Sequence, residues 1–166
     1  MKTLDIELAL AHRCDYSHNV IVPNVFWGLG FSHELDLCIM SKSGYLTEIE
    51  IKVSLQDLKK DREKTHCHID RQNRIKYLYF AMPSSVACKG WAYIPEDAGL
   101  YAVSSAGRVI ELIKPKQRKG VRPLTEKEQL QLCRLSTMRV WKLKHELKDK
   151  QNLIKHLRDV ATKESC

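Results

Sequence analysis

The chain has 166 residues, of which 43% are apolar and 29% charged, and carries a net charge of +8. Apolar residues are too frequent for a disordered chain, and no apolar run approaches the roughly 20 residues of a membrane span. Acidic residues near the N-terminus argue against a secretory signal, so we expect a cytoplasmic protein with no membrane contact.

The first third of the chain is predicted to form one helix and three strands. Apolar residues at helical spacing indicate a helix from Thr3, its candidate N-cap, to about Cys14. Branched and aromatic residues indicate a strand over 20–27. Two alternating runs, 33–40 and 45–53, flank a short glycine-containing turn and are typical of an antiparallel hairpin.

The middle of the chain is predicted to add a charged helix, a buried strand and a second hairpin. Ser54 is the candidate N-cap of a helix over 55–68. An apolar run with aromatic residues indicates a strand over 76–82. Residues 100–103 and 108–113 flank a glycine-containing turn and predict a hairpin near the edge of the sheet.

The C-terminal part differs from the rest in charge. Residues 1–113 contain 13 lysines and arginines against 14 acidic residues, whereas residues 114–166 contain 15 against 6. This excess favours a polyanionic partner, with DNA as the first expectation, because Lys and Arg release counterions when they neutralise phosphates. A solvated, lysine-rich helix accounts for the same composition.

Breaker residues divide the chain into a domain, residues 1–115, a basic linker, residues 116–124, and a basic helical extension, residues 125–166. Thr125 and Glu128 have the spacing of a capping box at the start of the extension. No Gly or Pro interrupts the helical propensity as far as about Lys163.

Apolar residues recur every seven positions in the extension, as in a coiled coil. One seam is regular and the second is interrupted: Cys133, Val140, Leu147, Ile154 and Ala161, then Ser136, Leu143, Lys150 and Leu157. This pattern predicts either a helix packed on its own domain or a modest antiparallel or dimeric coiled coil, with a homodimer as one candidate assembly.

The six cysteines have no Cys-x-x-Cys spacing, which argues against a zinc ribbon or a thioredoxin motif. His66, Cys67 and His68 stand together, but no second Cys/His pair lies at the distance of a zinc finger. We therefore expect reduced, mostly structural thiols.

Acidic residues alternate along both strands of the first predicted hairpin. Residues two apart share a face of a strand, so Glu34 and Asp36 are predicted to point together. The next strand presents a larger set on one face: Glu48, Glu50 and Lys52. The opposite faces are predicted to form the core: Leu35, Leu37, Ile39, Ile49, Ile51 and Val53. Asp36 can pair with Glu50 or with Glu48, and both registers leave an acceptable turn.

Carboxylates gathered on one face repel one another, and a divalent cation relieves that repulsion. We therefore predict a Mg²⁺ or Mn²⁺ site formed by Asp36, Glu50 and the carbonyl of Ile51. Lys52 would orient or deprotonate the attacking water, or stabilise the charge that develops on a phosphate. Two other acids are further candidate ligands: Glu48 and Glu7. The alternative is an exposed edge hairpin decorated with acids.

Asp36 and, fourteen positions later, Glu50-Ile51-Lys52 resemble the PD-(D/E)XK nuclease signature, with Leu35 in the position that often holds Pro. Over about residues 20–115 the chain is also similar to the MmcB-like DNA-repair family. The matching motifs follow one another in order: Glu50-Ile51-Lys52-Val53-Ser54, Asp57-Leu58, Asp61-Arg62, Tyr79-Phe80-Ala81, Pro95-Glu96-Asp97-Ala98-Gly99-Leu100 and Ala106-Gly107. His33 and Glu34 stand where this family tends to have basic residues.

The resemblance implies an α/β fold with a restriction-endonuclease-like mixed central sheet of four or five strands flanked by helices, to which the chain adds a long C-terminal helix. It implies metal-dependent hydrolysis of DNA phosphodiester bonds by Asp36, Glu50 and Lys52, in DNA repair, recombination or the processing of phage or mobile-element DNA. A non-catalytic nucleic-acid-binding or repair-accessory module with this fold is the alternative, and an assembly protein that dimerises through its long helix is another.

Residues of the second helix and of the linker are the candidate contacts to the DNA backbone: Ser54, Lys59, Lys60, Arg62, Lys116, Arg118, Lys119 and Arg122. Their side chains can neutralise or hydrogen-bond phosphates. Interleaved acids on the second helix fit a solvated face equally well, and Ser54 is first of all a cap.

Overall fold

The computed structural model describes residues 1–62 and 72–164. Its centre is a six-stranded mixed sheet in which neighbouring strands follow one another in the sequence. The strands are β1 (Val20–Val25), β2 (Leu35–Met40), β3 (Leu46–Ile51), β4 (Ile75–Pro83), β5 (Gly99–Val103) and β6 (Val109–Ile113). β3, β4 and β5 run parallel, and the other neighbours are antiparallel.

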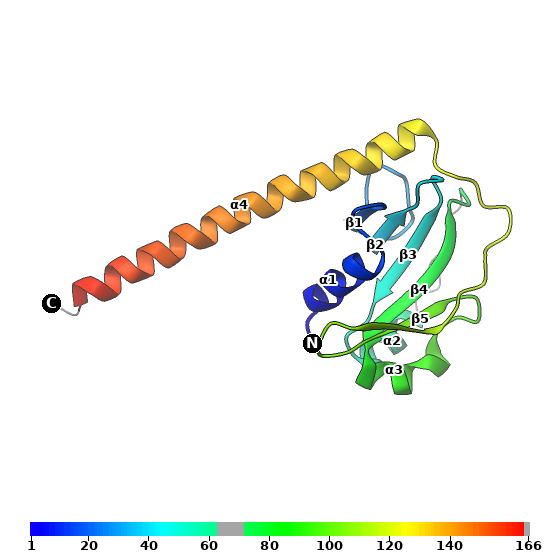
Figure 1. The fold of residues 1–166 in the computed structure, drawn as a ribbon, viewed down its shortest axis with the longest axis horizontal. Coiled ribbons are helices and arrows are strands. Elements are labelled where there is room, and N and C mark those ends of the chain that lie inside the picture. Colours follow the sequence, from blue (N-terminus) through cyan, green and yellow to red (C-terminus); the bar gives the residue numbers. More distant parts are fainter. Residues whose placement is uncertain (63–71, 165–166) are drawn as a thin grey trace.

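Helices cover both faces of this sheet (Figure 1). They are α1 (Thr3–Arg13), α2 (Leu55–Arg62), α3 (Ser84–Gly90), the short 3₁₀ helix η1 (Trp91–Tyr93) and α4 (Glu126–Glu164). The predicted fold class is therefore confirmed: an α/β protein with a mixed central sheet flanked by helices and a long C-terminal helix. The predicted number of four or five strands was too low by at least one.

Three apolar clusters fill the space between the sheet and the helices. α1 packs on one face through Ile6 and Leu10, against Leu37 and Ile49. On the other face, the first turns of α4 cover β1 and β2. α2 and α3 cover β4 and β5 on that same face, in a cluster that contains Leu58 and other apolar residues. Both faces of the sheet are thus buried, which explains the nearly continuous apolar character of β4 and β5.

Within the described part of the chain, the predicted helix over 55–68 is seen as α2, and residues 63–68, with His66, Cys67 and His68, lie outside the described residues. Ser54 caps α2, since its Oγ accepts a hydrogen bond from the Asp57 amide at 3.1 Å. The prediction of Thr3 as the N-cap of α1 was wrong by one residue. Lys2 occupies the cap, and its amide donates to the Asp5 carboxylate at 2.8 Å.

β2 and β3 form the predicted antiparallel hairpin, with Leu37 opposite Ile49 and Met40 opposite Leu46. This register places Asp36 opposite Glu50, which is one of the two pairings that the sequence left open. The hairpin lies in the interior of the sheet, between β1 and β4. The alternative of an exposed edge hairpin was therefore wrong.

The predicted core face was wrong at two positions, Leu35 and Val53. Leu35 packs under α4, whereas Leu37 and Ile39 pack under α1. Val53 follows β3 and is 37% exposed. Beside Leu35 the neighbouring strand is also irregular, since Asn24 adopts a left-handed φ of +53° and the pairing of β1 with β2 is interrupted there.

The predicted linker, residues 116–124, runs along the sheet domain and is held there by backbone hydrogen bonds. The amides of Arg118, Arg122 and Leu124 donate to the carbonyls of Lys76, Asn73 and Gly44 at 2.9–3.1 Å. We call residues 114–124 the strap.

After the strap, α4 begins at Glu126 with Thr125 and Glu128 in the predicted capping box. Leu124, Leu132 and Leu135 are buried in the core under β1 and β2, so the start of α4 belongs to that core. From residue 140 to residue 159 every side chain of α4 is exposed, and Figure 1 shows this part extending away from the sheet. Among the described residues, no helix has the length and apolar character needed to cross a membrane.

Candidate metal centre

The hairpin buries an unusual set of charged side chains in the middle of the sheet. Glu48 and Glu50 on β3 and Lys52 directly after it are 0%, 4% and 6% exposed. Asp36 lies half-buried at the start of β2. Charged side chains are rarely this deeply buried unless they are paired or functional. The sequence predicted that these residues lie together, and it did not predict their burial.

Two hydrogen bonds fix the predicted catalytic residues relative to one another. The Lys52 ammonium donates to Oε2 of Glu50 at 2.9 Å. The Ile51 amide donates to Oδ2 of Asp36 at 2.8 Å, which draws this carboxylate toward β3. The Lys52 amide donates to the carbonyl of Ala81 and so ties the end of β3 to β4. The predicted role of the Ile51 carbonyl as a ligand stays a prediction.

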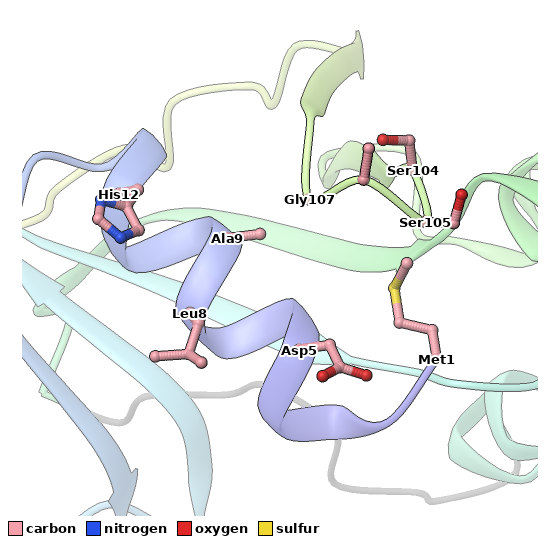
Figure 2. A pocket seen from close by; sticks show the side chains of 9 residues that line it. Met1, Asp5, Leu8, Ala9, His12, Ser104, Ser105 and Gly107 are labelled. Carbon is pink, nitrogen blue, oxygen red and sulfur yellow. The ribbon is translucent and has the colours of Figure 1, made fainter.

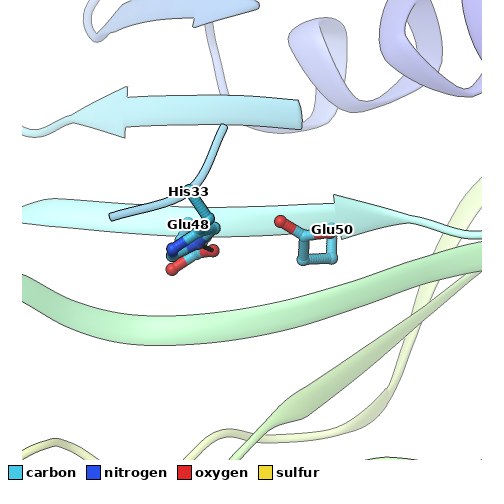
Figure 3. Close-up of side chains that lie close together, drawn as sticks. All are labelled: His33, Glu48 and Glu50. Carbon is cyan, nitrogen blue, oxygen red and sulfur yellow. Dashed lines mark hydrogen bonds and ion pairs between the residues drawn. The ribbon is translucent and has the colours of Figure 1, made fainter. Parts of the chain in front are cut away.

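His33, which was not predicted as a site residue, joins this group. Its Nε2 lies 2.6 Å from Oε1 of Glu48. Ligand atoms of His33, Glu48 and Glu50 all lie within 4.8 Å of one another, and Figure 3 shows their side chains grouped on one side of β3. The alternating run 33–40 was predicted to begin at His33, but in the structure His33 lies in the loop before β2, and no sequence pattern indicated its contact with Glu48.

Burial raises the pKa of Glu50 to about 7, and the negative charge of Asp36 adds to this effect. Lys52 acts in the opposite direction, by its charge and its hydrogen bond. The pKa of Glu7 on α1 is also raised, by burial and then by Asp36. Glu7, a predicted further ligand, is therefore close enough to Asp36 to sense its charge. Perturbed carboxyl groups of this kind are common in functional sites.

A buried arginine anchors the loop that carries His33. Arg74 is 1% exposed, and its Nη1 donates to the carbonyl of Leu29 at 2.5 Å. Its guanidinium also lies over the ring of Phe31, 4.3 Å from the ring centre. Both contacts fall between β1 and β2, so Arg74 fixes the approach of this loop to the hairpin.

The predicted DNA contacts in and before α2 have different environments. Ser54 caps the helix. Lys59 lies over the ring of Tyr93, 5.0 Å from its centre, and Lys60 is exposed. Arg62 ends α2, and its side chain lies outside the described residues.

In the strap, three predicted DNA contacts form ion pairs with acids of the chain itself. Lys116 pairs with Glu96, and Arg118 pairs with Asp97 at 3.3 Å. Arg122 donates to both carboxylate oxygens of Glu128. Lys119 is exposed. The basic charge of Lys116, Arg118 and Arg122 is thus partly compensated within the protein.

A hollow of about 680 Å³ lies elsewhere, between α1 and the turn that joins β5 to β6 (Figure 2). Its lining includes Asp5 and His12 of α1 and Ser104 and Ser105 of the turn. Asp5 already accepts the cap hydrogen bond from Lys2. None of the acids of the hairpin lines this hollow, so it is separate from the candidate metal centre.

No family model matches the chain, and no curated protein matches it. The fold is similar to that of a protein of unknown function from Silicibacter pomeroyi, with a TM-score of 0.62 and 12% sequence identity. The match covers 91% of this chain and 94% of that chain, so it includes part of α4. At this identity the similarity concerns the fold alone.

Proposed function

We propose that the chain is a divalent-metal-dependent nuclease that hydrolyses DNA phosphodiester bonds. The observation that carries the proposal is the convergence of Asp36, Glu50 and Lys52 at the buried end of one hairpin. Asp36 and Glu48 both raise the pKa of Glu50, and Lys52 lowers it. Carboxylates gathered in a buried position are the ligands that a divalent cation prefers.

The donor set fits a small divalent cation. Carboxylates of Asp36 and Glu50 are the hard oxygen ligands that Mg²⁺ and Mn²⁺ prefer. The imidazole of His33, next to Glu48, adds a nitrogen ligand that suits Mn²⁺ or Zn²⁺ better than Mg²⁺. A bound metal ion would supply Lewis acidity toward a phosphoryl oxygen and lower the pKa of water.

The protein's own groups would divide the remaining tasks. Lys52, which donates a hydrogen bond to Glu50 at 2.9 Å, would orient the attacking water or stabilise negative charge on the phosphate. Asp36 is kept in one orientation by the Ile51 amide. The buried environment strengthens each of these electrostatic interactions relative to water.

DNA is the proposed substrate because the basic excess lies in the strap and α4. The exposed lysines Lys60 and Lys119 are the proposed backbone contacts that no described acid pairs with. A module that binds DNA without cleaving it is the competing function, and the following experiment separates the two.

Purified protein is incubated with plasmid, single-stranded and branched DNA in Mg²⁺, in Mn²⁺ and in EDTA. We expect cleavage in metal only, and a loss of roughly a hundredfold or more in Asp36→Asn and Lys52→Met. Glu126→Gln, which alters an exposed acid of α4, is the matched control and should cleave like the wild type. Thermal unfolding confirms that each variant is folded. Equal cleavage by wild type and both variants, or binding without cleavage, would contradict the proposal.

A further inference from the structure

The exposed part of α4 carries an apolar seam that the sheet domain does not cover. The seam residues are each between 49% and 61% exposed: Val140, Leu143, Leu147, Ile154 and Leu157. They follow the alternating three- and four-residue spacing of the a and d positions of a coiled coil, with Lys150 completing the series. Most helical stability in proteins comes from packing of an apolar face, and no described part of the chain covers this one, so a partner helix would stabilise it.

The positions of the seam are symmetric about a midpoint between residues 148 and 149. Val140 and Leu157 lie at equal distances from it, as do Leu143 and Ile154, and Leu147 and Lys150. In an antiparallel pair of helices, each a position of one helix packs against a d position of the other. Two copies of this helix therefore form two fully apolar layers on each side of the centre.

Electrostatic repulsion favours an antiparallel over a parallel pair of these helices. In a parallel pair Lys150 would meet Lys150 of the other copy inside the seam, which is unfavourable. In the antiparallel pair Lys150 faces Leu147 of the other copy. Its aliphatic stem can cover this leucine while the ammonium reaches water. Lys144 then lies beside the neutral Gln151 rather than beside another cation.

We propose that α4 pairs with α4 of a second copy of the chain as an antiparallel coiled coil centred between residues 148 and 149. The overlap from Val140 to Leu157 spans about 26 Å at 1.5 Å per residue. The sheet domains then stand at opposite ends of the pair, which agrees with the way α4 extends away from the sheet in Figure 1. This proposal is independent of the nuclease proposal.

The first test is the mass of the full chain in solution, measured by light scattering after gel filtration and by sedimentation equilibrium. We expect twice the chain mass of 19.2 kDa. Leu147→Asp with Ile154→Asp should weaken association at least tenfold. Trp141→Asp is the matched control, because Trp141 is 58% exposed but lies off the seam, and it should leave the dimer unchanged. Circular dichroism verifies that the sheet domain stays folded.

The second test is orientation, measured by disulfide cross-linking with a Cu²⁺–phenanthroline oxidant. The exposed cysteines Cys88 and Cys133, and Cys166, are first replaced by Ser. Leu143→Cys combined with Ile154→Cys should then cross-link two copies, whereas Leu143→Cys alone should not. Efficient cross-linking of the single variant would indicate a parallel pair and overturn the proposal.

Salt dependence and binding of a synthetic peptide distinguish self-association of α4 from binding of a different partner helix. Both copies are basic, so self-association should strengthen as NaCl is raised. A chain that stays monomeric at every concentration and salt would overturn the proposal. If such a monomer binds a synthetic amphipathic helix with glutamates beside its apolar seam, α4 serves a different, acidic partner.

Discussion

The position of Glu50 in the hairpin exposes its pKa to opposing effects. Burial and the carboxylate of Asp36 favour its protonated form, and the ammonium of Lys52 favours its charged form. The first two prevail, and the pKa stands at about 7 against an ordinary value of 4.5. The folded chain therefore binds this proton more tightly than the unfolded chain does.

The raised pKa of Glu50 predicts how the free energy of unfolding depends on pH in metal-free buffer. Between pH 4.5 and about 7 the folded state holds the Glu50 proton and the unfolded state has lost it, so the free energy of unfolding falls as the pH rises. From pH 5 to pH 8 we expect a loss of about 2 kcal/mol that Glu50→Gln does not show. Urea unfolding in EDTA at both pH values measures it. Parallel pH profiles for wild type and variant would contradict the assignment.

His33 shows why single site residues are hard to predict from a sequence. The acids of β3 follow a period of two, so their shared face was predictable. His33 approaches them through a loop whose path depends on Arg74, 41 positions away, and on the carbonyl of Leu29. No local pattern reports a contact of that kind.

At the scale of elements, the join between the strap and α4 is the most elaborate cap in the described chain. The hydroxyl of Thr125 accepts from the Glu128 amide, and the Glu128 carboxylate accepts from the Thr125 amide at 2.8 Å. The same carboxylate binds the guanidinium of Arg122 through both oxygens. The hydrogen bond from Arg122 is the main cause that lowers the pKa of Glu128 to about 2.

Glu128 therefore stabilises the fold with the opposite pH dependence to Glu50. Its contribution is complete above pH 4.5 and is lost as the pH falls from there toward 2, because protonation removes the charged acceptor. We expect Glu128→Gln to lower the free energy of unfolding by about 2 kcal/mol at pH 7 and by much less at pH 3. Chemical denaturation at the two pH values tests this, with Glu126→Gln as the neutral control. An equal deficit at both pH values would exclude the mechanism.

Elements with strong periodicity were predictable from the sequence, whereas their arrangement in space was harder to predict. Both hairpins, the capping box at Thr125 and the long helix were expected from local pattern. The position of the first hairpin inside the sheet was not, because pairing of β3 with the distant β4 leaves no local signal. The packing of Leu35 under α4 was also not predictable, because it falls where the pairing of β1 with β2 is interrupted at the left-handed Asn24.

For the whole molecule, the boundary between the packed domain and the exposed extension lies within α4 rather than at the strap. Leu132 and Leu135 are 0% and 1% exposed in the core under β1 and β2, whereas the side chains of residues 140–159 are exposed. Arg139 adds hydrogen bonds to the carbonyls of Pro23 and Asn24, where the first two strands separate. The charge and heptad pattern indicated one basic extension, and it did not reveal that the start of this helix belongs to the core of the sheet domain.

Truncation separates these two parts. A chain ending at residue 139 retains the whole core, and we expect cooperative unfolding with a stability close to that of the full chain. A chain ending at residue 124 loses two buried leucines, each of which contributes roughly 2–5 kcal/mol, and should not fold cooperatively. Thermal melting followed by circular dichroism compares the two. Equal stability of both truncated chains would show that the start of α4 is dispensable.

The late place of Leu132 and Leu135 in the chain has a consequence for its synthesis. All six strands are synthesised before the leucines that close the core over β1 and β2. Until then Val22, Cys38 and Met40 face water on the unfinished side of the nascent sheet. The completed fold thus requires a helix that is translated last, and a chain released from the ribosome within the strap would expose this apolar surface to chaperones.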